Sequence, residues 1–369
     1  MSSYASKEMN IMGAKAFIES LSRTDSRTTK NSTILYAVLG KSNSWPNEPT
    51  ATNAIETIQD KHYQLWKDAV GAKKINTGDV SHVIPRNNWA INTIYPMYKE
   101  TNQSLYSQNF YVLTDQMNVY KCLYNNKGGQ STVKPTSFAT QAFSTSDGYT
   151  WKYMYTISLG KANKFLTASH MPVQTLTSAG GSTEGTNQMA VQNASVNGAI
   201  HVVETNNIGS GYGMVSSTAV IGATPNTIQL AQGNPSTVDN FYNGDSVYVQ
   251  SGTGLGQLRR IVNYEGSSRT LTTNTNFTTT PFTDSTIIIS PTVNVVGDGN
   301  GALAYSLVNT NGNISNVNII AVGTKYTRAK VYITSNTTHG TGATANAIIS
   351  PIGGHGKDAI RELGGNKVC

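Results

Sequence analysis

The six histidines are the first candidates for chemistry, because imidazole serves both as a metal ligand and as a general base. None of them lies three or four residues from another histidine or cysteine, which is the spacing that zinc sites use. The sequence therefore predicts no metal site built on His62, His82, His170, His201, His339 or His355.

Two glycine-rich tracts have some features of ligand-binding loops. "GDGNGALA" (297–304) is followed by no Lys-Ser/Thr pair, and Asp298 is its sole carboxylate, so we expect a plain turn between strands. "GGHGKDAIRELGG" (353–365) places glycines before a short helix, whose N-terminus could hold an anion. Since a second basic partner is missing, a loop and helix that dock the C-terminus are the favoured interpretation.

No arrangement for covalent or acid–base catalysis is visible. The nucleophile-elbow spacing Gly-x-Ser-x-Gly is absent, and "GSGYG" does not supply it. Carboxylates are scarce, and Asp147 alone lies beside a cluster of aromatic residues. We therefore predict no enzyme, no catalytic residue and no cofactor.

Aromatic residues alternate along "DGYTWKYMYTI" (147–157), where Tyr149, Trp151, Tyr153 and Tyr155 share one face of a predicted strand. Such a stripe could be a platform on which sugars or bases stack. It also fits a half-buried sheet face with tyrosine hydroxyls at its wet edge, which we favour. Any exposed part would suit a protein interface.

The segment "VIPRNNWAINTIYP" (83–96) has two prolines and neither a helical nor a strand period, yet it contains Arg86 and Trp89. A proline-fixed extended segment presents its side chains at low entropic cost, and Arg and Trp dominate many interfaces. The segment is therefore a candidate contact surface. An internal loop whose Trp89 fills its own core is an equal alternative, and the two are compatible.

These candidates must be positioned by a mixture of helices and strands. Apolar periodicity predicts a helix over 7–21 and a buried strand over 32–40, and a capping box at Asn53 and Glu56 predicts a second helix over 53–70. From residue 105 the period is two, with a probable hairpin around "TDQM" (114–117).

The second half contains an internal repeat. "GAIHVVETNNIGSGY" (198–212) aligns with "GNISNVNIIAVGTKY" (312–326), and "GNGALAYSLV" (299–308) matches "GTGATANAII" (340–349). The predicted fold is mainly β, with an α+β N-terminal domain and antiparallel sandwich modules carrying Gly-rich repeats. The predicted divisions are a domain over 1–175, a linker over 176–190, a repeated β module over 191–225 and 292–369, and an inserted small β module over 226–291.

Composition supports this class. Only 13% of the 369 residues are charged and Gly reaches 34, as in turn-rich β proteins. Residues 1–172 hold 18 Lys and Arg against 11 Asp and Glu, but the lysines are scattered, which does not favour nucleic acid. Two cysteines, Cys122 and Cys369, fit a reducing compartment, and neither a membrane span nor a signal peptide is expected.

Four irregular segments, in this order and spacing, resemble the gene-product-eight type baseplate wedge subunit of T-even-like contractile-tailed bacteriophages. They are "NSTILYAVLGKSNSWPNEP", "VIPRNNWAINTIYP", "NVYKCLYNN" and "SDGYTWKYMYTI", and the resemblance covers about residues 1–172. The carry-over, as fold and contact positions, reaches Trp45, Pro85, Arg86, Trp89, Tyr95, Cys122, Asp147, Gly148, Tyr149 and Trp151.

The resemblance implies a structural protein of the virion tail baseplate, assembled in the bacterial host cytoplasm, without enzymatic activity, metal or cofactor. It implies a homodimer within each wedge that docks to other wedge proteins, with no nucleic acid and no membrane span. In that family the C-terminal portion returns to complete the first domain, whereas here we expect it to belong to the repeat.

Two rival functions remain open at this stage. The C-terminal repeats could belong to a tail fibre or adhesin that recognises host surface glycan. A polysaccharide-cleaving enzyme would instead need carboxylates clustered in a groove.

Overall fold

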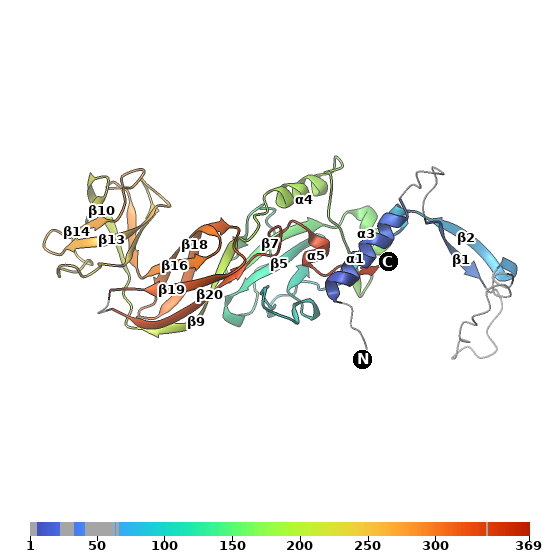
Figure 1. Cartoon of the computed structure of the whole chain (residues 1–369), viewed down its shortest axis with the longest axis horizontal. Helices are drawn as coiled ribbons and strands as arrows, with labels where there is room; N and C mark the ends of the chain where they lie inside the picture. Colours follow the sequence, from blue (N-terminus) through green and yellow to red (C-terminus); the bar gives the residue numbers. More distant parts are fainter. Residues whose placement is uncertain (1–5, 23–32, 41–62, 64–65, 337–338) are drawn as a thin grey trace.

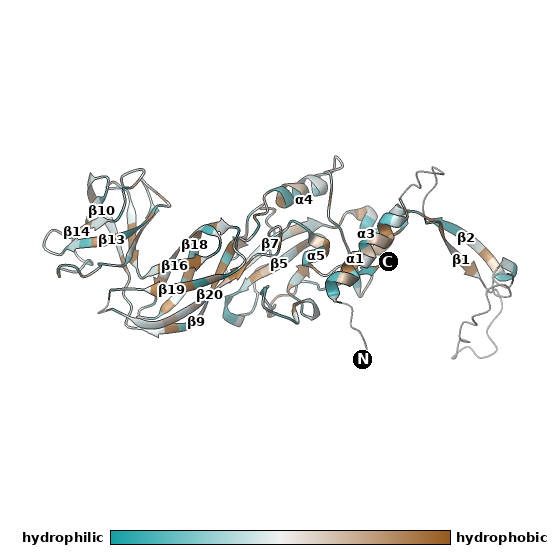
Figure 2. Cartoon of the chain, in the orientation of Figure 1, coloured by the Kyte–Doolittle hydropathy of each residue, from teal (hydrophilic) through white to brown (hydrophobic). Residues whose placement is uncertain are grey.

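The computed structural model describes residues 6–22, 33–40, 63, 66–336 and 339–369. The molecule is elongated, with a β-barrel at one end, a two-stranded arm at the other, and a six-stranded sheet and an N-terminal module between them (Figure 1). Apolar residues line the strands of the central region in Figure 2. All pairings between the named strands are antiparallel, so the prediction of a mainly β, antiparallel fold is confirmed.

The N-terminal module is built around an antiparallel sheet in the order β4-β5-β7-β6. Its strands are β4 (Tyr111–Leu113), β5 (Asn118–Asn125), β6 (Phe143–Ser144) and β7 (Tyr149–Thr156). The turn between β4 and β5 is the predicted hairpin, with Met117 at φ 61° donating its N–H to Thr114. Nearly all of β5 and β7 is buried, so this sheet is the centre of the module.

A second small sheet brings the end of the chain back to this module. Its order is β21-β3-β8, with β3 (His82–Pro85), β8 (His170–Val173) and β21 (Lys367–Val368). The helices of the module are α1 (Lys7–Ser20), α3 (Leu159–Phe165), α4 (Thr183–Asn193) and α5 (Ala359–Glu362). Short 3-10 turns lie at Thr77–Asp79, Leu105–Ser107 and Asn126–Gly128.

The predicted N-terminal helix is confirmed as α1, which begins after Ser6, whose hydroxyl accepts the N–H of Met9. Its buried Ile11 and the buried Leu21 beyond its end lie on the face that the periodicity selects.

The internal repeat lies in one six-stranded sheet of order β18-β17-β16-β19-β20-β9. The two repeat pairs are the outer strands at its opposite ends, β9 paired with β20 and β18 paired with β17. The bounds are β9 (Ile200–Ser210), β16 (Thr292–Gly297), β17 (Asn300–Val308), β18 (Ile314–Thr324), β19 (Ala329–Thr334) and β20 (Thr341–Ile349).

Equivalent glycines and tyrosines make the same contacts in the two copies of the repeat. Gly209 and Gly323 both have positive φ, and a Cβ on either would lie under 3 Å from a tyrosine ring, Tyr212 or Tyr326 respectively. The N–H of Tyr212 donates to Gly312 at 2.9 Å. The N–H of Tyr326 donates to Gly198 at 3.2 Å, so the two copies interlock reciprocally at both ends.

A closed barrel is inserted between β9 and β16, with the strand order β10-β11-β14-β13-β12-β15. Its strands are β10 (Val215–Thr224), β11 (Thr227–Leu230), β12 (Ser246–Ser251), β13 (Leu258–Glu265), β14 (Thr270–Thr273) and β15 (Thr286–Ser290). Its core is separate from that of the sheet, and it contains Tyr242, Tyr264 and Phe277 among aliphatic residues.

Several element boundaries differ from the predictions. The barrel begins at Val215 rather than at 226, because β10 pairs with β11 and β15. Residues 183–193, predicted as linker up to 190 and as repeated β module beyond it, form α4, whose N-cap Ser182 accepts the N–H of Gly185. Beyond Ile349 the chain leaves the repeated sheet and joins the N-terminal module through α5 and β21, so the prediction that the repeated β module extends to residue 369 is wrong.

The arm consists of β1 (Leu35–Gly40) and β2 (Ala69–Ile75), which pair antiparallel. The strand predicted over 32–40 is therefore present from Leu35, but it is exposed rather than buried. The helix predicted over 53–70 lies mainly outside the described residues, and its last two positions belong to β2. None of the helices that the structure describes is long and apolar enough to cross a membrane.

Candidate functional site

The segment 83–96 has an irregular backbone that is fixed by hydrogen bonds to the rest of the N-terminal module. Its backbone forms hydrogen bonds to three other parts of the module, from Trp89 to Leu113 (2.8 Å), from Asn92 to Ser131 (2.8 Å) and from Arg86 to Ser169 (2.9 Å). Isolated bridges join Asn88 to Leu113 and Thr93 to Ser131. These contacts fix a stretch that has no regular secondary structure beyond Pro85.

Aromatic side chains form the floor beneath this segment. Trp151 stacks on Tyr149, with ring centroids 5.3 Å apart, and meets Tyr95 edge to face at 5.9 Å. The hydroxyl of Tyr149 accepts the N–H of Tyr95 and donates to Gly129 at 2.6 Å. All three rings are buried, as are Tyr153 and Tyr155, so the stripe along β7 is core and a stacking platform for sugars or bases is excluded.

Asp147 is the polar centre of the neighbouring turn. Its carboxylate accepts the backbone N–H groups of Thr132 (2.8 Å) and Val133 (2.9 Å), together with the hydroxyl of Thr145. Burial raises the pKa of Asp147, but these hydrogen bonds outweigh that effect and the net pKa lies below its ordinary value. The residue therefore shapes the loop as a fixed anion, and it is not poised to transfer protons.

Trp89 is tied into the same network, because its Nε1 donates to the Ser131 hydroxyl, which in turn donates to Asp147. The ring is half-buried against the module core, as the internal-loop interpretation predicts. Arg86 lies at the edge, where its guanidinium donates to Asn88 and to the carbonyl of Thr167. Pro85 is exposed and its carbonyl accepts the hydroxyl of Tyr111.

The part of the segment that faces solvent is apolar. Ile91 is 60% exposed and Ile94 is 55% exposed, and both lie between the anchored positions Trp89 and Tyr95. Sequence reasoning missed these two residues because it weighted Arg and Trp. Their position could have identified them. Apolar side chains placed among asparagines in a segment without helical or strand period have no apolar face on which to be buried.

The structure thus gathers five of the predicted site residues and separates others. Trp89, Tyr95, Asp147, Tyr149 and Trp151 form one connected network, with Pro85 and Arg86 at its margin. Trp45 lies outside the described residues. Cys122 is fully buried, and burial raises its pKa, so it is part of the core.

A second cluster, which sequence reasoning did not find, joins the chain end to the centre of the N-terminal module. Lys121 on β5 is fully buried and its ammonium group lies 2.9 Å from the carboxylate of Glu362 on α5 and 3.0 Å from the ring of His355. The ammonium group also lies 4.0 Å from the centre of the Tyr98 ring. Lys152 on β7 is buried nearby and donates to the carbonyl of Thr140.

This cluster ties the end of the chain to the N-terminal module. Burial lowers the pKa of Lys121, an effect that Glu362 opposes, and burial lowers the pKa of Lys152 to about 8. The pKa of His201 falls to about 4, through burial and the two lysines. The other oxygen of Glu362 accepts the N–H groups of Gly356 and Asp358, so these donors at the start of α5 already have a carboxylate. The docking interpretation of 353–365 is correct.

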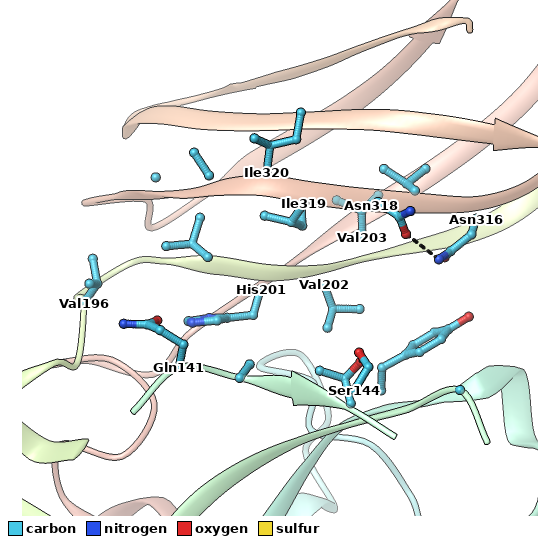
Figure 3. A pocket seen from close by; sticks show the side chains of 18 residues that line it. Gln141, Ser144, Val196, His201, Val202, Val203, Asn316, Asn318, Ile319 and Ile320 are labelled. Carbon is cyan, nitrogen blue, oxygen red and sulfur yellow. Dashed lines mark hydrogen bonds between the residues drawn. The ribbon is translucent and has the colours of Figure 1, made fainter. Parts of the chain in front are cut away.

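A cleft of about 890 Å³ lies between the six-stranded sheet and strands β6 and β7 (Figure 3). One wall is formed by consecutive residues 316–323 of β18, with His201 and Val202 of β9 beside it, and Ser144 lies opposite. No charged residue lines it, and its polar groups are amides, hydroxyls and the His201 ring. It contains no carboxylate pair for glycoside hydrolysis.

No group of three or more potential metal-ligating residues occurs in the part of the chain that the structure describes. The "GDGNGALA" tract is a turn between β16 and β17, in which Asp298 accepts the N–H groups of Thr327 and Arg328. The hydroxyl of Thr327, together with these two N–H groups, holds the pKa of Asp298 well below its ordinary range and leaves the carboxylate engaged within the chain.

No protein-family model matches the sequence, and no curated protein is similar to it. Among solved structures, the chain is similar to one described as "Virion of native gene transfer agent (GTA) particle", with a TM-score of 0.21 and 12% sequence identity. The similarity covers 47% of this chain and 52% of that one, so the chain spans about half the length of the solved chain. No function is inferred from a likeness at this level.

Proposed function

We propose that this chain is a structural protein of a contractile phage tail, a baseplate wedge subunit that works through dimerisation and through docking to other wedge proteins. The observation that carries the proposal is the rigid presentation of Ile91 and Ile94 on a segment fixed by buried aromatic and hydrogen-bonded neighbours. A surface that is already ordered loses little entropy when a partner binds it.

The resemblance of the four irregular segments supplies the biological setting for this surface. In the structure, three of them, "VIPRNNWAINTIYP", "NVYKCLYNN" and "SDGYTWKYMYTI", meet in one place, since Tyr95, Cys122, Asp147 and Tyr149 belong to one connected region. The three segments that carry the sequence resemblance therefore pack together into one rigid unit. Such a unit suits a protein whose role is to hold neighbours at set positions.

The placement is tested by the position of the chain in an electron-microscopy map of the intact tail. We expect density for residues 80–175 in each wedge of the baseplate, in contact with subunits of different sequence. Density in the fibres or in the capsid would overturn the proposal.

The contact surface is tested separately with the double variant Ile91→Asp and Ile94→Asp. Two charges placed in a buried interface strongly disfavour docking, so we expect incorporation into purified baseplates to fall at least about tenfold. The matched control is Leu159→Asp, which changes a residue that is 77% exposed elsewhere on the same module. Equal incorporation of both variants would show that the segment is not a docking surface.

A further inference from the structure

The arm formed by β1 and β2 is too small to be stable by itself. A two-stranded sheet alone is marginal in water, and such a sheet normally acquires further strands or packs on a core. In the described part of the chain, the arm has no third strand, and Figure 1 shows it projecting from the end of the molecule opposite the barrel.

The side chains of the arm are unusually apolar for a solvated element. Tyr36 is 53% exposed, Leu39 is 75% exposed and Val70 is 74% exposed, and five of the six residues of β1 belong to the exposed class. Tyr36 and Leu39 lie on opposite faces of β1, so apolar side chains are exposed on both faces of the arm, as expected for an element that a partner completes.

The two edges of the arm differ in charge, and this difference indicates which edge is open to pairing. β2 carries Lys73 and Lys74 side by side, which is how natural proteins protect an edge strand from pairing with a copy of itself. β1, of sequence LYAVLG, carries no charge at all. Its edge lacks that protection.

We propose that the arm associates with a second copy of this chain, in which the β1 edges of two molecules pair antiparallel about a two-fold axis to form a four-stranded sheet. An antiparallel pair of identical strands is self-complementary under such an axis, so the interface closes at two copies. No like charges meet along a β1–β1 edge, whereas a β2–β2 edge would bring two copies of Lys74 together, Lys73 being paired with Asp79.

This inference rests on the proposed function in one respect, because it assigns a surface to the dimer which that function includes. It adds that dimerisation and docking use different parts of the molecule. The arm would join two copies, and the segment at Ile91 and Ile94 would face other subunits.

The test uses the full chain and charge exchange at Leu39, which is exposed and therefore tolerates substitution without loss of the fold. Sedimentation analysis should show a dimer for the native chain at micromolar concentration. Leu39→Lys and Leu39→Glu should each raise the dimer dissociation constant at least about tenfold, because each places two like charges, one from each copy, within the short sheet that the two β1 strands form. Mixing the two variants should restore a dimer that contains one of each.

The matched control is Val70→Lys, which places a charge at an equally exposed position of β2. We expect this variant to remain dimeric. Loss of the dimer in Val70→Lys as well would place the contact on a face of the arm and overturn the edge pairing. A native monomer, or a mixture that stays monomeric, would overturn the proposal even if the chain is found in the baseplate. A chain absent from the baseplate that still shows the charge exchange would overturn the function and leave the arm interface intact.

Discussion

The N-terminal module is held together by contacts between unlike residues far apart in the sequence, whereas the six-stranded sheet uses one local arrangement twice. In the module, the Lys121 and Glu362 pair spans 241 positions and joins a strand to the last helix. In the sheet, a glycine with positive φ accommodates a tyrosine ring at Gly209 with Tyr212 and again at Gly323 with Tyr326.

Because of this difference, we expect the two regions to lose stability through different kinds of substitution. A buried ion pair depends on both partners, and loss of either leaves an uncompensated charge in the core. The repeated arrangement in the sheet depends on the absence of a Cβ at one position, so any side chain there disturbs it. Three sets of substitutions test this contrast, from the largest expected effect to the smallest.

The largest effect is expected for Glu362→Gln, which keeps the size of the side chain and removes its charge. Lys121 and Lys152 would then be buried without a counter-charge, and we expect the free energy of unfolding to fall by about 3–5 kcal/mol. Chemical denaturation followed through the fluorescence of the module, whose Trp151 is buried beside β5, measures the change.

The double variant Lys121→Met with Glu362→Leu serves as the control for this prediction. Replacing both partners by apolar residues removes the unpaired charge of Lys121, so part of the stability should return, although Lys152 stays buried and the N–H groups of Gly356 and Asp358 lose their acceptor. A cost below about 1 kcal/mol for the single change would mean that water reaches the cluster and would contradict its role as a tie.

The same contrast explains how much could be predicted from the sequence. The repeat was found because its glycines and tyrosines keep a fixed spacing, and an arrangement made by residues close together in the chain can be recognised from the sequence alone. The stripe along β7 was found for the same reason. The cluster at Glu362 was missed because charged residues are expected at the surface, although Lys121 and Lys152 each lie between aromatic or apolar residues in a buried strand.

Long-range placement was likewise beyond the sequence. The return of residues 351–369 to the N-terminal module depends on β21 pairing with β3 and on the ion pair to Lys121, neither of which leaves a periodic trace. The sequence identified the segment 83–96 as a candidate contact surface, but it did not decide which of its side chains face the core and which face solvent. Only the hydrogen bonds beneath it show that Trp89 and Tyr95 point inward while Ile91 and Ile94 point outward.

An intermediate effect is expected for alanine at the two equivalent glycines. A Cβ at Gly209 would lie 2.6 Å from the carbonyl of Thr341, and a Cβ at Gly323 would lie 2.6 Å from the amide nitrogen of Ala302. Both sites also have positive φ, so each substitution should cost about 2–4 kcal/mol, and the two costs should agree within about 1 kcal/mol.

Thermal unfolding of the two variants is compared with that of Gly213→Ala, since a Cβ at Gly213 would meet nothing within 4 Å. This control should be near neutral. A large cost at Gly323 combined with none at Gly209 would show that the two copies are not equivalent, and it would remove the symmetry on which the comparison rests.

The smallest effect concerns pH, whose influence on stability has opposite signs at the two junctions of the sheet, with the barrel and with the N-terminal module. Burial raises the pKa of Asp245, at the junction of barrel and sheet, to about 6, while burial lowers the pKa of His201, on β9 where the sheet meets His355 of the module, to about 4. The stability that Asp245 contributes is therefore present at low pH and lost as the pH rises through 6. The contribution of His201 is present above pH 6.5 and lost as the pH falls towards 4.

Asp245→Asn separates these two contributions. The amide keeps an oxygen that can accept the hydroxyl of Ser335, which lies 2.6 Å from the carboxylate, and it removes the cost of a buried charge. We expect the variant to be about 1–2 kcal/mol more stable at pH 7 and unchanged at pH 4, since the native carboxyl is protonated there. Hydrogen exchange of β12 and β15 reports on the barrel alone, because their paired amides lie beside this junction. Destabilisation at pH 7 would show that the carboxylate holds the barrel to the sheet through its charge, and the two regions would then depend on the same kind of contact.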